Sequence, residues 1–599
     1  MNGRLVRVSG VVVAPAFLAL LFSVSTPGTL PRPAIDPLFD ATSAATIAGQ
    51  LSTDFPGRVP GTEDAVAAAR WYDQTVAAAG IRTETHSWRE DLPDLGEVEL
   101  QNVVAVVPGR SAETVVVVAH RDNTGADGRF GDNASGTAAL VELARGFGLR
   151  GGPTPAAVPQ RTLVFVSTDA GAYGGAGAAR FARTSPYAEQ ALAVVVLDGI
   201  GGGGRPRIAL ASDTPASPSR ALVSTARARV EDEAGVAPTL PSPVSQLVGL
   251  GVPLAIGEQG RFLDRGIAAI TLTTTEPGEP KLPVGDANAP LSAARLGQLG
   301  RAAEAVVTSV DESVGAAFRT PDSVFFGDRV ASGWALRLTL VVLVAPFAVG
   351  VADLLARARR RGLAFRPAVR ALRARLLLWA YGAILLWVGA VAGILPTGAD
   401  LPLPPYSESV LDHSGLGVAL LLVAFVAGWL VARRPLAAAG VVPSVEVRLS
   451  GHAVALTWLG VVAVSAAVAK PYALVFLLPS LYAWLWLPLQ TRLAPAAGLY
   501  LVGLAGPVLL LVALGVDLGL GPVDTLVYLA GLVTVGYVSI PAILLAVAWL
   551  ASASQLAALA FGRYAAYAGG VEPPPPGLVR GSVGAIARKV RERRYASAT

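Results

Sequence analysis

Long apolar runs fill most of the chain after about residue 330. Each is close to the roughly 20 residues that an α-helix needs to cross the hydrocarbon core of a bilayer. There are seven, at approximately 334–355, 376–395, 415–432, 452–469, 472–490, 496–516 and 525–550. Residues 35–320 have instead the mixed composition of a water-soluble domain. The sequence therefore predicts a soluble domain at 35–320, followed at 330–562 by an all-α polytopic membrane domain of about seven helices, whose partner is the lipid bilayer.

Two further segments lie at the ends of the chain. Arg4 and Arg7 precede an apolar run from about Val8 to Val24, which is typical of a signal peptide or a retained signal anchor. The following "SVSTPGTLP" contains small residues suited to cleavage, so residues 1–28 keep both interpretations. Residues 563–599 contain "GGVEPPPPGLV", a stiff linker, and then a basic tail that is expected to lie in solution or on anionic lipid.

The distribution of arginine predicts the orientation in the membrane. Eight arginines separate the runs at 334–355 and 376–395, whereas the next loop, "PTGADLPLPPYSESVLDHS", has acids and neither Lys nor Arg. Because cytoplasmic loops are enriched in Lys and Arg, the first loop is expected inside and the second outside. Arg433 with Arg434, then Arg492, then the tail continue this alternation. We therefore expect a multi-pass protein of the cytoplasmic membrane with residues 35–320 on its outer side.

Composition excludes several functions. The chain has no cysteine, which rules out disulfides, thiolate zinc ligands and a cysteine nucleophile. Its net charge of +5 does not indicate nucleic-acid binding, since the basic residues gather beside the apolar runs. The central parts of the runs contain no ionisable residue, which favours an anchor over a transporter or an intramembrane protease, the two alternatives for this half.

Within residues 35–320, apolar strand-like runs alternate with helical patterns. The strands are expected in "NVVAVVPG", "TVVVVAH", "TLVFVSTD" and "LAVVVLDG". Continuous Val and Leu runs separated by helices predict an α/β domain with a largely buried sheet. Ligands of such sheets gather at the carboxyl ends of the strands. His120 with Asp122, then Asp169, then Asp198 follow three of these ends, and Asp132 precedes a helix.

These segments carry a family resemblance. The stretches "FPGRVPGTEDAVAAARWYDQTVAAAGI", "VVVVAHRD", "GDNASGTAALVELAR" and "AVVVLDG" resemble the two-zinc aminopeptidase family of metallopeptidases, relatives of glutamate carboxypeptidase and the transferrin receptor. The resemblance implies zinc as the cofactor, with His120 as a ligand of the first ion, Asp132 bridging both ions and Asp198 completing the first site. It also implies that Asp122 orients the site.

The chain departs from the family pattern at three positions. The resemblance implies two adjacent glutamates after the "TLVFVSTD" strand, one the general base and one a ligand of the second zinc, but "DAGAYG" has Gly171 and Ala172 there. The family's last histidine ligand is also missing from "AITLTTTEPGEPKLPVGD". The other histidines are His86, early in the domain, and His413 and His452 in the membrane half.

Two functions remain open. One zinc ion can still lower the pKa of bound water to about 7, so a membrane-anchored peptidase acting outside the cell with one ion is possible if Asp169 or Glu258 substitutes as the base. A positioned base contributes about 10²–10⁴-fold to the rate, and a second metal clamps the substrate. Their loss favours the alternative, a non-catalytic receptor or scaffold that binds a peptide or protein outside the membrane. The transporter is a third, less favoured alternative.

Overall fold

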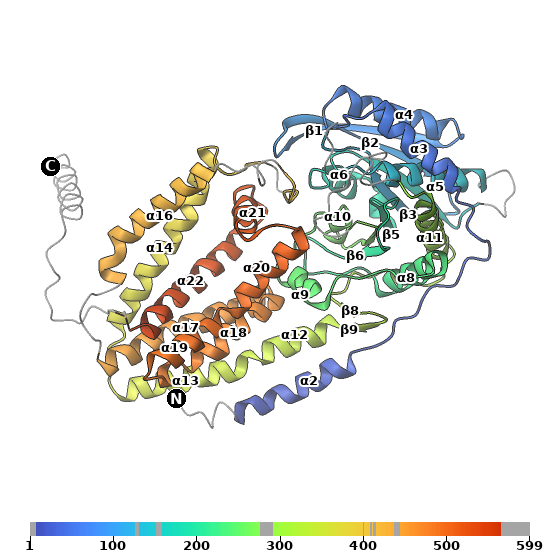
Figure 1. Ribbon diagram of the computed structural model, residues 1–599. Helices are drawn as coiled ribbons and strands as arrows, with labels where there is room; N and C mark the ends of the chain where they lie inside the picture. The colour runs from blue at the N-terminus through green and yellow to red at the C-terminus, as the bar shows by residue number, and fades with distance from the viewer. Residues whose placement is uncertain are drawn as a thin grey trace, which may run out of the picture.

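The computed structural model describes residues 8–125, 131–150, 158–275, 291–398, 401–407, 410, 415–436, 444–562 and 564. It consists of an α/β domain followed by a helical part (Figure 1). The expected mixed α/β fold with a helical C-terminal region is therefore confirmed. Nearly all of the linker and tail expected at 563–599 lies outside the described residues, as does His413.

Seven strands of the described α/β domain form one sheet in the order β1-β2-β4-β3-β5-β7-β6. The central strands β4, β3, β5 and β7 are parallel, and the strands toward the two edges run antiparallel. The strands are β1 (Arg82–Leu92), β2 (Gly96–Val107), β3 (Ser111–His120), β4 (Arg161–Thr168), β5 (Ala191–Leu197), β6 (Arg207–Ala209) and β7 (Ala268–Thr273), and a separate hairpin joins β8 (Val324–Phe326) to β9 (Arg329–Ala331).

Helices cover both faces of this sheet, because alternate residues of each central strand point to opposite sides and both sets are apolar. On β3, Val115 and Val117 belong to the larger core, which includes residues of α3, α5, α8 and α11. Val116 and Val118 belong to the smaller core, which includes residues of α6, α7 and α10. The helices are α3 (Ala41–Asp54), α4 (Glu63–Ala77), α5 (Ala134–Arg150), α6 (Ala176–Thr184), α7 (Pro186–Glu189), α8 (Arg220–Ala234), α9 (Pro243–Gly251), α10 (Gln259–Leu263) and α11 (Ala293–Asp311).

The helical part contains five helices long and apolar enough to cross a membrane, or six if the bent pair α19 and α20 is one span, among the described residues. The N-terminal helix α2 lies beside it, and Thr339 of α12 donates a hydrogen bond to the carbonyl oxygen of Ala16 at 3.0 Å. The elements are η1 (Gly10–Val12), α2 (Val13–Phe22), α12 (Gly333–Val342), α13 (Val344–Arg360), α14 (Arg366–Val391), α16 (Gly415–Leu436), α17 (Val445–Ala469), η3 (Pro471–Ala473), α18 (Leu474–Leu485), η4 (Leu487–Leu489), α19 (Leu493–Gly503), α20 (Ala505–Leu518), α21 (Pro522–Thr534) and α22 (Ile540–Ala560).

Two of the seven expected spans are divided in the structure. The run at 496–516 forms α19 and α20, which are bent by 42° at their junction. The apolar run at 525–550 was expected to form a single helix, but it is divided between α21 and α22. Gly536 has a φ of 86°, and Pro541 occupies the first turn of α22. A left-handed glycine ends a helix and a proline suits the start of the next one, so the run breaks between them.

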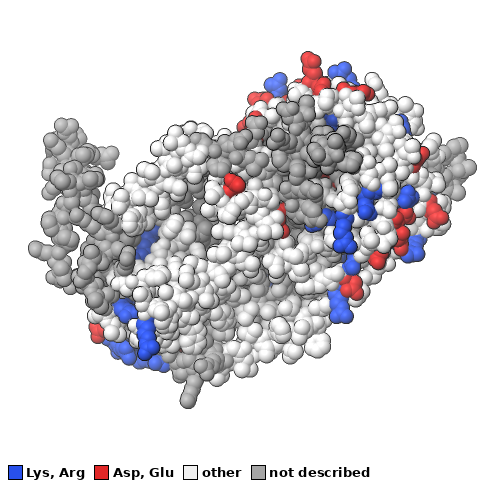
Figure 2. Space-filling view, viewed as in Figure 1, with Lys and Arg blue, Asp and Glu red and all other residues white. Residues whose placement is uncertain are grey.

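Charged side chains are distributed unevenly over the surface. In the face shown in Figure 2 they gather on the α/β domain and at the end of the helical part farthest from it, with a largely uncharged belt between. The last turn of α13 carries three of the arginines, Arg357, Arg359 and Arg360. Such a belt is the surface expected of helices surrounded by lipid.

The other end of the helical part contacts the α/β domain through several inter-helix segments. Asp517, at the end of α20, accepts a hydrogen bond from Ser245 of α9 at 3.0 Å. Tyr537, between α21 and α22, donates to Asp213 at 2.6 Å. Tyr406, from the loop between α14 and α16, donates to the carbonyl oxygen of Ala172 at 2.9 Å. The α/β domain is thus joined to the ends of three separate helical segments.

Candidate functional site

Three of the candidate side chains meet at the carboxyl ends of β3 and β5. His120 is the last residue of β3, where its neighbours across the sheet are the ends of the parallel strands β4 and β5. Its Nδ1 lies 3.3 Å from Oδ1 of Asp122, and its Nε2 lies 3.5 Å from Oδ1 of Asp198. Both ring nitrogens of a buried histidine therefore face carboxylates.

This arrangement favours the charged imidazolium. Burial acts to lower the pKa of His120, but the charges of Asp122 and Asp198 and their hydrogen bonds outweigh it and raise the pKa to about 10. Burial likewise opposes ionisation of Asp122, yet His120 and the N–H groups of Ala172 and Gly171 lower its pKa overall. Those two N–H groups donate to the Asp122 carboxylate at 2.9 and 2.8 Å. Asp122 thus links His120 to the "DAGAYG" turn.

Asp132 is held by other partners. Its Oδ1 accepts from the backbone N–H of Ala134 at the start of α5, at 2.8 Å, and its Oδ2 accepts from the Arg58 guanidinium at 2.9 Å. The Arg58 side chain is fully buried, and it also donates to the carbonyl oxygens of Arg121 and Phe55. A carboxylate that neutralises a buried guanidinium is not available to bridge two metal ions without leaving that charge unpaired.

The residues implied as zinc ligands consequently do not form a metal centre in this arrangement. Within the described part of the chain, no three His, Asp or Glu side chains are placed so that they could hold one ion. His120 lies between two carboxylates, and Asp132 is paired with Arg58. Gly171 and Ala172 have no side-chain atom that could bind a metal ion. The donor set as it stands does not fit the two-zinc centre implied by the family resemblance.

The glycine at position 171 is required by packing. A Cβ atom there would lie 2.2 Å from Cβ and 2.3 Å from Cγ of His120. Real Cβ contacts are never this short, so any side chain at this position would displace the histidine. Ala172 is buried, with 2% exposure. Its methyl carbon packs close to Gly131, because a Cβ atom added at Gly131 would lie 2.8 Å from that carbon. The glutamate implied at position 171 therefore has no room beside His120 in this packing.

The two candidate substitute bases have different surroundings. The Asp169 carboxylate forms an ion pair with Arg121 at 3.0 Å and accepts from the N–H groups of Gln101 and Ala170, both at 3.0 Å. Burial raises the pKa of Asp169, although the charge of Arg121 acts against it. Because Oδ2 lies in this buried ion pair and Oδ1 accepts from the Ala170 N–H, Asp169 is placed as a structural residue.

Glu258, directly before α10, lies closer to the candidate chemistry. Its Oε1 accepts from the Thr168 hydroxyl at 2.5 Å, and its Oε2 has no hydrogen-bond partner among the described residues. Burial raises the pKa of Glu258 to about 7, while the charge on His120 and the Thr168 hydrogen bond act in the opposite direction. Glu258 and His120 line the same cavity, so of the two acids the structure places Glu258 where a ligand would lie.

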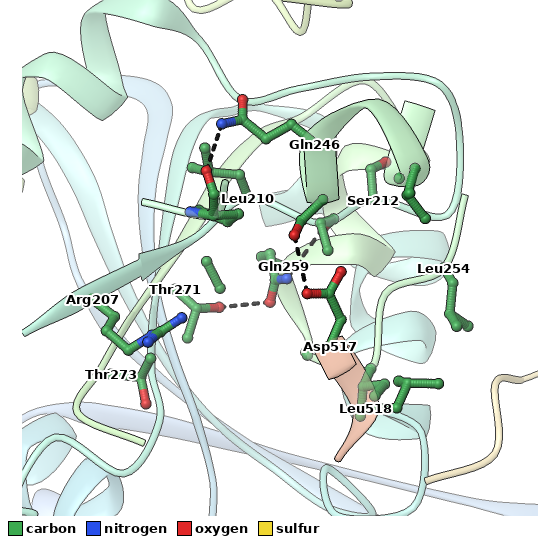
Figure 3. Close-up of a pocket in the computed structure, with 18 of the residues that line it drawn as sticks. Arg207, Leu210, Ser212, Gln246, Leu254, Gln259, Thr271, Thr273, Asp517 and Leu518 are labelled. Atoms are coloured by element: carbon green, nitrogen blue, oxygen red, sulfur yellow. Dashed lines mark hydrogen bonds between the residues drawn. The ribbon is translucent and has the colours of Figure 1, made fainter. Parts of the chain in front are cut away.

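The cavity has a volume of about 960 Å³ and extends from His120 and Asp198 to the end of α20. Figure 3 shows the part of it that Thr271, Gln259 and Asp517 line. Polar groups of the α/β domain line part of it, including Thr271, which donates to Gln259 at 2.6 Å. Asp517 and Leu518 of α20 and Tyr406 line it from the helical part. Both parts of the chain therefore contribute to its walls.

Sequence reasoning did not identify Arg58, Tyr406 or Asp517. Arg58 stands in "FPGRVPG", and no local sequence pattern indicates that an arginine will be buried. Tyr406 contacts Ala172 across 234 residues, a separation that no motif spans. His86 lies on β1 with an exposed side chain, and His452 is buried in α17, so neither joins the cavity.

Comparisons with known proteins agree with the fold. Residues 102–244 match the model of Peptidase family M28, which confirms the resemblance to zinc metallopeptidases. Similar solved structures include a glutaminyl cyclase from Porphyromonas gingivalis, with 18% identity, a TM-score of 0.34 and coverage of 45% of this chain and 98% of that one. No curated protein sequence matches the chain.

Two other similar structures are described as peptidases. The first is an aminopeptidase from an Aneurinibacillus species, with 13% identity, a TM-score of 0.35 and coverage of 47% of this chain and 95% of that one. The second is described as a putative zinc-dependent exopeptidase from Bacteroides vulgatus, with 17% identity, a TM-score of 0.32 and coverage of 46% and 97%.

Proposed function

Because residues 102–244 match Peptidase family M28, we propose that this chain is a multi-span membrane protein whose peptidase-like domain binds peptides outside the cytoplasmic membrane without two-zinc hydrolysis. One observation carries the proposal. A Cβ atom at position 171 would lie 2.2 Å from Cβ of His120, so the side chain implied as the general base has no room beside that histidine. The domain keeps a cavity of about 960 Å³ at this place, which suits binding.

The contacts between the two parts support the outer location. The loop between α14 and α16, predicted to lie outside because it lacks Lys and Arg, contacts the α/β domain through Tyr406. The arginines of α13 lie at the opposite end of the helical part from this contact (Figures 1 and 2). Placing these arginines inside puts the α/β domain outside.

Glu258 supports a second candidate function, a one-zinc peptidase. Its Oε2 has no hydrogen-bond partner among the described residues, and its carboxyl group has a pKa of about 7 in the cavity that His120 also lines. A general base works best when its pKa is near the working pH. The implied zinc ligands His120, Asp132 and Asp198 do not converge on one point among the described residues. A one-zinc peptidase would therefore require Asp132 to leave Arg58, or zinc to bind with fewer protein ligands.

Peptide retention distinguishes these functions. The full-length protein, purified in nanodiscs, is incubated with a mixture of free peptides, and bound peptides are identified by mass spectrometry. We expect recovery of intact peptides, in equal amounts with and without a zinc chelator. Peptides shortened at the N-terminus in a chelator-sensitive way would support the one-zinc enzyme, and a failure to retain any peptide would contradict the proposed function.

A further inference from the structure

A segment of the helical part lies directly on the "DAGAYG" turn of the α/β domain. Residues 401–407, from the loop between α14 and α16, form this segment, which we call the cap. Besides the hydrogen bond from Tyr406 to Ala172, Leu401 packs against an apolar cluster that includes Leu92 and Ala170. The Ser407 hydroxyl donates to the Asp94 carboxylate. The cap is therefore bound along its length to the α/β domain.

The cap is also fixed from the helical side. Tyr528 of α21 donates to the carbonyl oxygen of Leu403 at 2.8 Å, and Leu403 is fully buried in a cluster with Tyr528 and Leu532. Gly174 of the turn has a φ of 80°, and a Cβ there would lie 2.6 Å from the carbonyl oxygen of Pro402. Turn and cap thus approach each other closely at a position suited to glycine.

Tyr406 reaches from the cap to the candidate site. It lines the cavity with His120, Gly171 and Asp198. Burial raises the pKa of its hydroxyl well above the usual value, and the charges of Asp198 and Asp122 act in the same direction. A ligand that reaches His120 and Asp198 would therefore lie close to a side chain from the helical part.

The opposite stretch of the cavity is lined by the end of α20, which presents the apolar side chains of Leu514, Val516 and Leu518. Figure 3 shows Leu254 and Leu518 on one side of the cavity and Arg207 and Thr273 on the other. Asp517 of α20 and Ser212 also lie on the side of Leu254 and Leu518, so apolar side chains and hydrogen-bonding groups line the cavity together. An alkyl chain would satisfy only the apolar side chains, because covering polar groups without new hydrogen bonds is unfavourable. A peptide with apolar side chains satisfies both, since its backbone supplies donors and acceptors.

We infer that the two parts of the chain build one composite cleft, in which Tyr406 of the cap and Val516 of α20 contact the apolar side chains of a bound peptide. This inference rests on the proposed peptide binding and adds the class of ligand and the contribution of the helical part. Because Leu514, Val516 and Leu518 belong to the end of α20, at the predicted outer face of the membrane, the cleft suits apolar peptide segments presented at the membrane surface.

The test uses two fluorescent peptides of equal length with free N-termini, one built of leucine and one of serine. Their binding to the full-length protein in nanodiscs is measured by fluorescence anisotropy, with empty nanodiscs as the blank for partition into lipid. We expect the leucine peptide to bind at least tenfold more tightly. Val516→Ser should weaken its binding about fivefold or more, because Val516 is exposed and is one of the residues that line the cavity. Val512→Ser is the matched control, since Val512 is exposed on the same helix but does not line the cavity.

Tyr406→Ala should weaken binding of the leucine peptide at least tenfold, and Tyr406→Phe should weaken it less because the ring remains. Tyr482→Phe is the control, since Tyr482 also donates to a backbone carbonyl, that of Leu343 at 2.7 Å, but does not line the cavity. Equal binding of the two peptides, or unchanged binding in Val516→Ser and Tyr406→Ala, would overturn the composite cleft while leaving peptide binding intact. If neither peptide binds, the proposed function fails and the inference fails with it.

Discussion

Replacing Gly171 by alanine tests the packing that separates this domain from a two-zinc peptidase. The added Cβ would lie 2.2 Å from Cβ of His120, and both atoms belong to the rigid first positions of their side chains. His120 is buried at the end of β3, where it has little space to move. Overpacking of this kind typically costs about 1–3 kcal/mol, which corresponds to an approximately 5- to 150-fold change in an opening equilibrium.

Hydrogen–deuterium exchange of the full-length protein in nanodiscs measures this change, because it reports the strands separately from the helical part. The β3 amides of Gly171→Ala should exchange about 5- to 150-fold faster than those of the wild type. Gly203→Ala is the matched control, since a Cβ at that loop position meets no atom within 4 Å. Equal β3 exchange in Gly171→Ala and Gly203→Ala would refute the argument that the missing glutamate is excluded by packing.

Three further outcomes are expected. Arg58→Met should destabilise the α/β domain by about 3–5 kcal/mol, because it leaves the Asp132 carboxylate buried without its ion pair, and faster exchange of the β3 amides would show it. The wild type should lose stability relative to Glu258→Gln as the pH rises from about 4.5 to about 7, since the raised pKa of Glu258 lets the folded state bind a proton that the unfolded state has released. The same difference in unfolding free energy between the two proteins at pH 5 and at pH 8 would contradict this. Protease added outside intact cells should cut within residues 35–320 and spare residues 357–375, and the reverse pattern would invert the orientation.

Local sequence patterns were sufficient to predict the α/β fold. Each central strand has apolar residues at successive positions, as Val115 to Val118 show, so apolar side chains point to both faces of the sheet. Such strands are covered by helices on both faces. The placement of His120 and Asp198 at one edge follows from the parallel arrangement of β3 and β5. The run at 525–550 was predicted as one span although it contains Pro541, which can kink a helix, because apolar residues continue on both sides of the break.

The site itself was less predictable. The sequence indicated which residues stand at the strand ends, but not that Arg58 would pair with Asp132 or that Tyr406 would lie over the turn. Both contacts join residues far apart in the chain, and their partners are decided by tertiary packing. Asp169 and Glu258 were equivalent as candidate bases in the sequence, and the structure separates them because Asp169 is paired with Arg121 whereas Glu258 lines the cavity.

The central claim is that this domain binds peptides without two-zinc hydrolysis, and release of N-terminal residues tests it most directly. The full-length protein in nanodiscs is given excess zinc and a fluorogenic leucine substrate, and turnover is compared with that of His120→Ala. We predict the same background rate for both proteins, unchanged by a chelator. Zinc-dependent, chelator-sensitive release by the wild type that disappears in His120→Ala would contradict the claim.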